Sequence, residues 1–189
     1  MHMVNAKKLW TVEEVQALPS DGNRYEVIDG ELLVSPAPTF RHQRALRDLF
    51  IAVHECCRTN RCGSVFFAPL DVVYGPRTMV EPDLLVLPLV NGREPDSVEE
   101  SGGLILVVEV LSPSTARTDR WRKRLLYQRQ QVPVYLIVDC DARIVERWCP
   151  GDERPEVLAE RLEWRATEGV APLIIELGPF FATIEGEIR

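Results

Sequence analysis

Two almost wholly apolar runs with a helical segment between them constrain the fold more than any other feature of this chain. LILVVEVL (104–111) and VYLIVD (134–139) are rich in β-branched residues, as expected of buried strands. Residues 117–130 contain neither Gly nor Pro and carry Trp121, Leu125 and Leu126 as apolar positions. The sequence therefore predicts a strand, a helix and a second strand in succession, which is typical of α/β proteins.

The segments before this region predict a hairpin, a helix and two more strands. RYEVIDGELLVS (24–35) has Asp29-Gly30 between two β-prone runs, and this dipeptide favours a tight hairpin turn. We expect a helix over about residues 40–58, capped by Thr39. Its apolar positions recur at helical spacing: Ala45, Leu46, Leu49, Phe50 and Val53.

Strands are expected over residues 65–74 and 80–87, and a polar, acidic loop without secondary structure over 88–103. Residues 143–148 predict a further strand, and residues 172–182 a weaker apolar element. The predicted order of elements is therefore hairpin, helix, three strands, helix and strand.

Length and composition favour one cytoplasmic domain. With 189 residues, 46% of them hydrophobic, the chain can form one sizeable core, so a single domain over residues 1–189 is expected. No run approaches the roughly 18 uncharged apolar residues that a membrane span needs. The five cysteines are an odd number without a secretory signal, which favours reduced thiols.

The charge distribution restricts how the chain can bind nucleic acid. A net charge of -7 argues against a protein that coats DNA, because non-specific affinity comes from neutralising phosphates. One short segment is nevertheless basic: Arg117, Arg120, Arg122, Lys123, Arg124 and Arg129. This segment is either a local DNA contact or a solvated helix face.

Glu109 is the most unusual residue of the sequence, because it interrupts an apolar strand in which a carboxylate needs a partner. If the strands 80–87 and 104–111 pair antiparallel, Asp83 becomes its neighbour, and Glu81 shares a face with Asp83. The partner of Glu109 is either a nearby arginine in a structural ion pair or a hard divalent cation such as Mg²⁺.

The helix after Glu109 brings further groups to the same edge. Lys123 and Tyr127 are four residues apart and share a helix face, as do Asp119 and Lys123. A carboxylate pair with a neighbouring ammonium is the equipment of metal-assisted phosphodiester hydrolysis.

Seven strings of this sequence, in order, carry a family resemblance. They are RYEVIDGELLVSPAP, RHQRAL, FAPLDVVYG, VEPDLLVL, VVEVLSPSTARTDR, K-x-x-x-Y and VPVYLIVD, and LIIELGPFF follows near the C-terminus. Together they resemble the Uma-two family of bacterial nucleases in the PD-(D/E)-x-K superfamily. The resemblance implies a restriction-endonuclease-like αβββαβ core, which is a mixed sheet flanked by helices. It also implies a Mg²⁺- or Mn²⁺-dependent endonuclease activity on DNA, and a homodimer by analogy of fold.

The same resemblance assigns roles to individual residues. Asp83 and Glu109 match the metal-binding acids, and Glu26 matches an acidic hairpin position that either completes the metal site or is an exposed carboxylate. Leu111 occupies the position of the superfamily's strand lysine, which makes Lys123 on the next helix the candidate for that cation. In the basic segment, Arg117, Arg120 and Arg124 are the residues expected to contact DNA, and Tyr127 is a candidate accessory residue of the site.

His42 and the cysteine-rich segment after it each have a structural and a functional interpretation. His42 lies near the start of its helix, either as a histidine at the edge of the core or as an accessory residue that reaches the cleft. His54, Cys56, Cys57 and Cys62 are close in sequence, but their spacing fits no zinc motif and favours buried small side chains.

Three functions remain compatible with the sequence. The first is the metal-dependent DNA endonuclease. The second is a catalytically inactive nuclease fold that serves as a binding or assembly module, which the missing strand lysine and the acidic composition permit. The third is a metal-dependent hydrolase of small phosphate esters that uses the same cleft.

Overall fold

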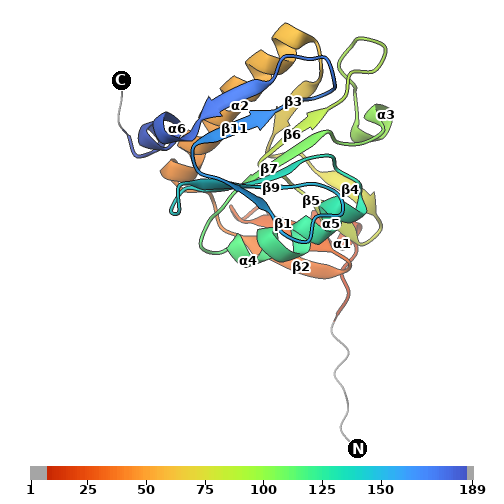
Figure 1. Ribbon diagram of the computed structural model, residues 1–189. Coiled ribbons are helices and arrows are strands. Elements are labelled where there is room, and N and C mark those ends of the chain that lie inside the picture. Colours follow the sequence, from red (N-terminus) through yellow and green to blue (C-terminus); the bar gives the residue numbers. More distant parts are fainter. Residues whose placement is uncertain (1–7, 187–189) are drawn as a thin grey trace, which may run out of the picture. The chain divides into compact units, whose positions relative to one another are not determined.

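The computed structural model describes residues 8–186, which form two compact units (Figure 1). The first unit comprises residues 8–37 and 71–81, and the second comprises residues 38–70 and 82–186. Residues 71–81 are therefore an excursion of the chain from the second unit into the first. The prediction of one domain over residues 1–189 stays a prediction.

The first unit is a four-stranded sheet with one short helix. Its strand order is β2-β1-β5-β4. The elements are α1 (Val12–Gln16), β1 (Arg24–Ile28), β2 (Glu31–Ser35), β4 (Val72–Gly75) and β5 (Thr78–Val80). Asp29 and Gly30 join β1 to β2 with φ angles of 52° and 83°, the positive values that a two-residue turn of this kind requires. The predicted hairpin is confirmed.

A six-stranded mixed sheet forms the centre of the second unit, in the order β10-β9-β8-β7-β6-β3. Its strands are β3 (Ser64–Phe67), β6 (Leu84–Leu87), β7 (Leu106–Val110), β8 (Tyr135–Asp139), β9 (Ile144–Trp148) and β10 (Glu156–Leu158). Only β7 and β8 pair parallel; the other neighbours are antiparallel. A helical crossover connects these two parallel strands, as parallel pairing requires.

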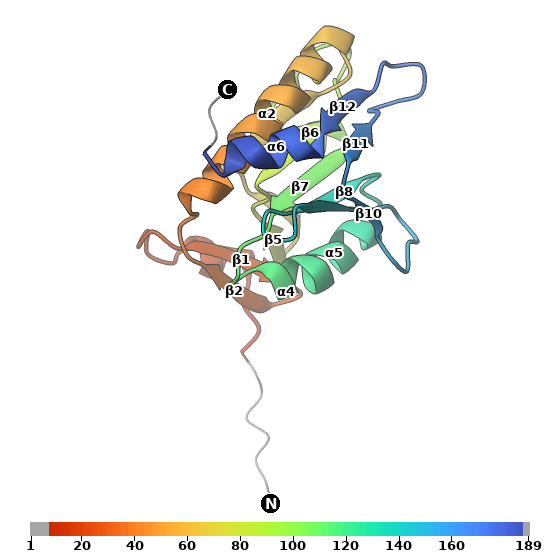
Figure 2. The same ribbon diagram turned by 60° about the vertical axis from the view of Figure 1, so that its left-hand side comes forward.

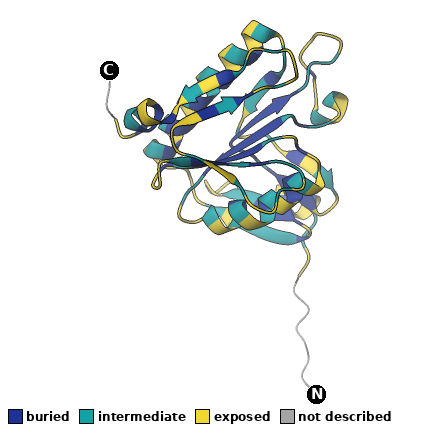
Figure 3. Ribbon diagram, in the orientation of Figure 1, coloured by how far each residue is buried: buried dark blue, intermediate teal, exposed yellow. Residues whose placement is uncertain are grey.

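Helices cover both faces of this sheet, as Figure 2 shows. On one face, α2 (Phe40–Asn60), α6 (Leu177–Ile184) and the two-stranded ribbon of β11 (Arg161–Trp164) and β12 (Leu173–Glu176) form one apolar core with alternate residues of the strands. On the other face, α5 (Arg124–Arg129) places Tyr127 4.8 Å from the ring of Tyr135 on β8. Strands β6 and β7 are consequently buried along their whole length, and β8 is buried except at Asp139 (Figure 3).

The crossover between β7 and β8 is one helical segment with an irregular middle. It begins as α4 (Ala116–Thr118), widens into a π-helix, η1 (Asp119–Lys123), and continues as α5. The backbone N–H of Arg124 donates to the carbonyl of Asp119, five residues earlier. Sequence periodicity predicted a helix here but not the wide turn, and π-turns are frequent at functional sites.

The fold class predicted from the sequence is confirmed. The second unit contains α2, β3, β6, β7, the α4–α5 crossover and β8 in chain order, which is the αβββαβ succession, with β4 and β5 inserted after β3. The helix expected over 40–58 extends over Phe40–Asn60, and the strand expected over 143–148 is β9. The apolar element at 172–182 is a strand followed by a helix, β12 and α6.

Three predicted elements were wrong in extent. The strand expected over 65–74 is two strands, β3 and β4, in different units, and the strand expected over 80–87 is β5 and β6. Pro69 and Pro82 stand in the two gaps, and a proline has no N–H for a sheet ladder. The loop expected over 88–103 contains a bridge between Val90 and Arg93 and the short helix α3 (Val98–Ser101).

Short elements α1, β10 and β11 were not predicted at all, because three to five residues carry too little periodicity to detect. No helix among residues 8–186 is long and apolar enough to cross a membrane.

Candidate active site

Asp83 and Glu109 lie opposite one another on adjacent antiparallel strands. In the register of β6 and β7, Leu84 pairs with Val108 and Leu85 with Val107. Continuing this register by one residue places Asp83 opposite Glu109. The backbone N–H of Val110 donates to Oδ2 of Asp83 over 2.8 Å, which fixes the Asp83 carboxylate at this edge. The antiparallel arrangement expected from the sequence is confirmed.

Both carboxylates are buried on the sheet face that α5 covers. Each residue is only 2% exposed. Val108 and Val110, on either side of Glu109, belong to the core under α2, so Glu109 points to the opposite face. A carboxylate removed from water in this way is stable only with charged or hydrogen-bonding partners.

Lys123 and Tyr127 supply such partners to Glu109. Nζ of Lys123 lies 2.8 Å from Oε1 of Glu109, and the hydroxyl of Tyr127 donates to the same oxygen over 3.3 Å. Lys123, like Glu109, is 2% exposed. The prediction that these two side chains share a helix face directed at Glu109 is confirmed. The ion-pair partner is a lysine rather than the arginine considered in the sequence analysis.

The π-helix directs two buried charges into the interior. Asp119 and Lys123 begin and end η1, and Nζ of Lys123 lies 3.9 Å from Oδ1 of Asp119. The hydroxyl of Tyr135 donates to the backbone carbonyl of Asp119 over 3.2 Å. The ammonium of Lys123 therefore lies between the carboxylates of Glu109 and Asp119.

His42 binds the other carboxylate. Its Nε2 lies 2.9 Å from Oδ2 of Asp83, and its backbone N–H is capped by the hydroxyl of Thr39. His42 is buried, and its Nδ1 forms no hydrogen bond within the described residues. The sequence left its role open between core and cleft. Thr39 caps the N-terminus of α2, and His42 in the first turn of this helix thereby lies beside the carboxylate of Asp83.

The arginines expected to contact DNA differ in their surroundings. Arg120 donates to Asp139 and to Glu146, over 2.7 Å in each case, so its charge is compensated within the fold. Burial tends to lower the pKa of Arg120, but these two carboxylates outweigh it and raise the pKa. Arg117 is exposed and forms no ion pair within residues 8–186, and Arg124 donates only to a backbone carbonyl and to Gln128.

Glu26 belongs to the first unit. It is 2% exposed, and its Oε1 accepts a hydrogen bond of 2.7 Å from the backbone N–H of Glu81. Glu81 forms an ion pair of 2.8 Å with Arg24. The expectation that Glu81 extends the strand of Asp83 was wrong, since the strand is interrupted at Pro82. The assignment of Glu26 to a metal site stays a prediction.

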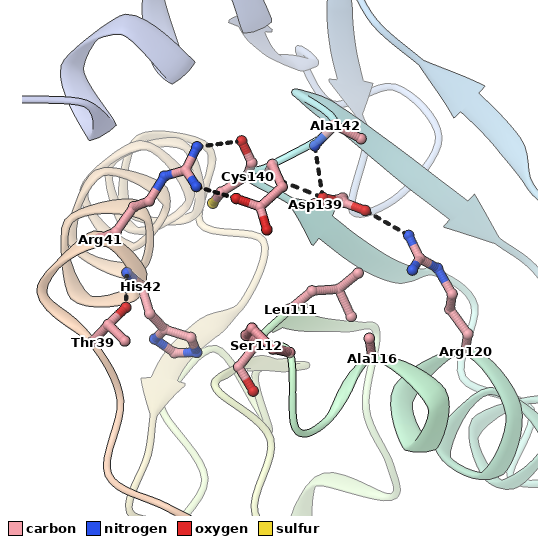
Figure 4. Close-up of a pocket in the computed structure, with 12 residues that line it drawn as sticks. Thr39, Arg41, His42, Leu111, Ser112, Ala116, Arg120, Asp139, Cys140 and Ala142 are labelled. Carbon is pink, nitrogen blue, oxygen red and sulfur yellow. Dashed lines mark hydrogen bonds and ion pairs between the residues drawn. The ribbon is translucent and has the colours of Figure 1, made fainter.

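A pocket of about 580 Å³ opens beside His42 at the carboxyl ends of β7 and β8. Figure 4 shows His42 and Arg41 on one wall and Ala116 and Arg120 on the opposite wall. Burial raises the pKa of the Cys140 thiol in this pocket to about 11, so the thiol is protonated at neutral pH and unsuited to nucleophilic chemistry.

The buried charges of this region fit a divalent cation. Three carboxylates, Asp83, Glu109 and Asp119, are buried together with a single ammonium, that of Lys123. Within residues 8–186, no three His, Cys, Asp or Glu side chains form a group that could hold a metal ion. A hard cation such as Mg²⁺ nevertheless retains several waters and needs only one or two carboxylates. Hydrogen bonds to one carboxylate oxygen are compatible with that role, because a carboxylate offers about four lone-pair sites.

Residues 12–177 match the sequence model of a protein family named Uma2 and described as "Putative restriction endonuclease". The chain belongs to the Uma2 family. The matched range includes Asp83, Glu109 and Lys123, and the resemblance of the seven strings to this family is thereby confirmed.

A solved structure with the same fold supports the Uma2 architecture. The crystal structure of a putative nuclease belonging to DUF820 from Anabaena variabilis matches 93% of this chain and 99% of its own, with a TM-score of 0.72 and 20% sequence identity. At that identity the likeness establishes the fold alone. No curated protein sequence matches this Uma2 chain.

Proposed function

We propose that this Uma2 protein is a divalent-metal-dependent endonuclease that hydrolyses phosphodiester bonds of DNA. One observation carries the proposal: the buried ammonium of Lys123 lies 2.8 Å from Glu109, on a strand where Leu111 stands in place of the superfamily's lysine. The crossover helix thus delivers the cation that the strand lacks, beside the carboxylates that would hold the metal.

Asp83 and Glu109 would hold the cation, which when bound supplies Lewis-acid polarisation of the phosphate and hydroxide near neutral pH. Asp83 and Glu109 lie opposite each other at the edge of β6 and β7, and this arrangement supports a role in binding one cation. His42 and the backbone N–H of Val110 both bind Oδ2 of Asp83, and they orient its carboxylate. Such outer partners are a general feature of metal sites.

Lys123 has two tasks in this proposal. It neutralises part of the buried negative charge, which lowers the repulsion that an incoming phosphate meets. Its compact ammonium also stabilises the charge that develops on the phosphoryl oxygens in the transition state. Tyr127 donates to the oxygen of Glu109 that Lys123 contacts, and so restrains that carboxylate.

The test is cleavage of supercoiled plasmid DNA with Mg²⁺ or Mn²⁺, compared with cleavage in a chelator. We expect metal-dependent nicking or linearisation that is lost in Asp83→Asn and Glu109→Gln. Gln43→Ala is a matched control, since Gln43 is an exposed neighbour of His42. A p-nitrophenyl phosphate ester tests the small-ester alternative. Metal-independent or absent cleavage of both substrates would contradict the proposal and favour an inactive binding module.

A further inference from the structure

Two large aromatic side chains, each adjacent in sequence to a residue that lines the pocket, are exposed to solvent. Phe40, the first residue of α2, is 87% exposed, and Trp121 in η1 is 63% exposed. Phe40 directly precedes Arg41 and Trp121 directly follows Arg120, and these arginines line opposite walls of the pocket (Figure 4). Single exposed apolar side chains are common on protein surfaces, so exposure alone does not indicate a binding role for Phe40 and Trp121. The residues around them provide the evidence.

Trp121 is held in place by a cation. The guanidinium of Arg124 lies 5.7 Å from the centroid of the Trp121 ring and 4.8 Å from that of Trp148. Arg124 is itself fixed by hydrogen bonds to the carbonyl of Arg120 and to Gln128. The indole is therefore partly ordered before any ligand arrives, which lowers the entropy lost on binding.

The charge around Trp121 is suited to a polyanion. Arg117 lies four residues before Trp121 and is exposed, and neither Arg117 nor Arg124 forms an ion pair with a carboxylate in the described part of the chain. The whole chain carries a net charge of -7, so this cationic surface is a local feature. Aromatic rings beside guanidinium groups are the combination that binds unpaired bases and their phosphates.

We propose that the DNA strand bound by this protein is single-stranded, and that its bases stack on Phe40 and Trp121, outside the pocket that Arg41 and Arg120 line. This inference rests on the proposed function, whose substrate it narrows. Bases in a duplex are already stacked on their neighbours, so they cannot offer a free face to either ring. A surface that merely attracted duplex phosphates would need the arginines but not the aromatic rings.

The experiment measures binding in a chelator, so that no cleavage occurs. A fluorescein-labelled oligothymidylate of about 16 nucleotides and a duplex of equal length are titrated with each variant, followed by anisotropy. Phe40→Ala and Trp121→Ala should each weaken binding of the single strand by about 5- to 150-fold and leave duplex binding unchanged. The salt dependence should not change, because stacking releases no counterions.

Conservative and control variants separate stacking from disturbed folding. Trp121→Phe should bind the single strand nearly as the unmodified protein does, but should lose most of the quenching of intrinsic fluorescence that the oligonucleotide causes. Ile51→Ala removes another exposed apolar side chain of α2, 58% exposed, and should have no effect. Thermal melting of every variant checks that the fold is retained.

The proposal is overturned if the unmodified protein does not bind the single strand, if single strand and duplex lose affinity equally, or if Trp121→Phe behaves like Trp121→Ala. A uniformly labelled RNA of the same length tests whether the site distinguishes the two sugars. Failure of the nuclease proposal is seen separately: a protein that binds single strands by stacking but cleaves no DNA with Mg²⁺ retains the binding inference and loses the activity.

Discussion

Nζ of Lys123 lies 2.8 Å from Oε1 of Glu109, and each of the two residues is only 2% exposed. An ion pair buried to this degree is strongly coupled to its surroundings, and desolvation of both charges opposes the attraction between them. The same pair can therefore contribute to stability and to catalysis. Substitutions that change shape as little as possible distinguish the two contributions.

Glu109→Gln should abolish cleavage and also destabilise the fold. The amide keeps the shape of the side chain but removes the carboxylate 2.8 Å from the buried ammonium of Lys123, and removing one partner of a buried pair typically costs about 3–5 kcal/mol. Urea denaturation measures this loss. The double variant Glu109→Gln with Lys123→Met should recover much of the stability but none of the cleavage. Recovery of cleavage in the double variant would show that the pair is structural only.

Lys123→Ala should cut saturating DNA at least about a hundredfold more slowly, because one preorganised donor to a developing charge is worth roughly 2.7–4 kcal/mol. Lys123→Arg should recover little, since a planar guanidinium cannot occupy the place of a compact ammonium. Single-turnover rates at saturating DNA measure the effect, with Arg122→Ala as the matched control from the same helical segment. Equal small losses for Lys123 and Arg122 would indicate a basic docking surface instead.

The residue pattern predicted the carboxylate pair and the shared helix face of Lys123 and Tyr127, whereas the choice of Lys123 as the cation came from the resemblance to the Uma-two family. Asp83 and Glu109 meet once two β-prone runs are paired antiparallel, and Lys123 and Tyr127 share a face because they are four residues apart. Glu109, a carboxylate in an otherwise apolar strand, was the strongest indication of a functional site in the sequence.

Other parts of the site depend on contacts between residues far apart in the chain, which one sequence does not reveal. Arg120 was expected to contact DNA, yet its ion pairs with Asp139 and Glu146 join a helix to two later strands. The π-helix at Asp119–Lys123 is only five residues long and was not predicted. The contact of His42 with Asp83 joins residues 41 positions apart, and Pro82, before Asp83, interrupts what the sequence analysis had treated as a continuous strand.

His42→Ala should weaken Mn²⁺ binding by about 10- to 100-fold, which is the usual effect of removing an outer partner of a metal ligand. The cause is that Oδ2 of Asp83 loses the hydrogen bond from His42, and its carboxylate can then rotate. Isothermal titration with Mn²⁺ measures the affinity, and Gln43→Ala is the control. Unchanged Mn²⁺ affinity, together with a lower melting temperature, would make His42 a core residue without a part in metal binding.

Asp139→Asn should destabilise the second unit at neutral pH and have little effect in acid. Burial tends to raise the pKa of Asp139, but the backbone N–H of Ala142 and the guanidinium of Arg120 outweigh it, and the pKa lies below its ordinary value. A carboxyl whose pKa is lower in the folded state contributes stability above its unfolded pKa of about 3.9 and loses it as pH falls through the folded value. The expected loss at pH 7 is about 1.5–3 kcal/mol, the range for hydrogen bonds to charged groups.

Urea denaturation between pH 7 and pH 3 measures this difference in the free energy of unfolding. Asp141→Asn is the control, because Asp141 is 79% exposed and pairs with Arg41 at the surface. A difference between Asp139→Asn and the unmodified protein that stays constant down to pH 3 would show that shape, and not charge, makes Asp139 stabilising.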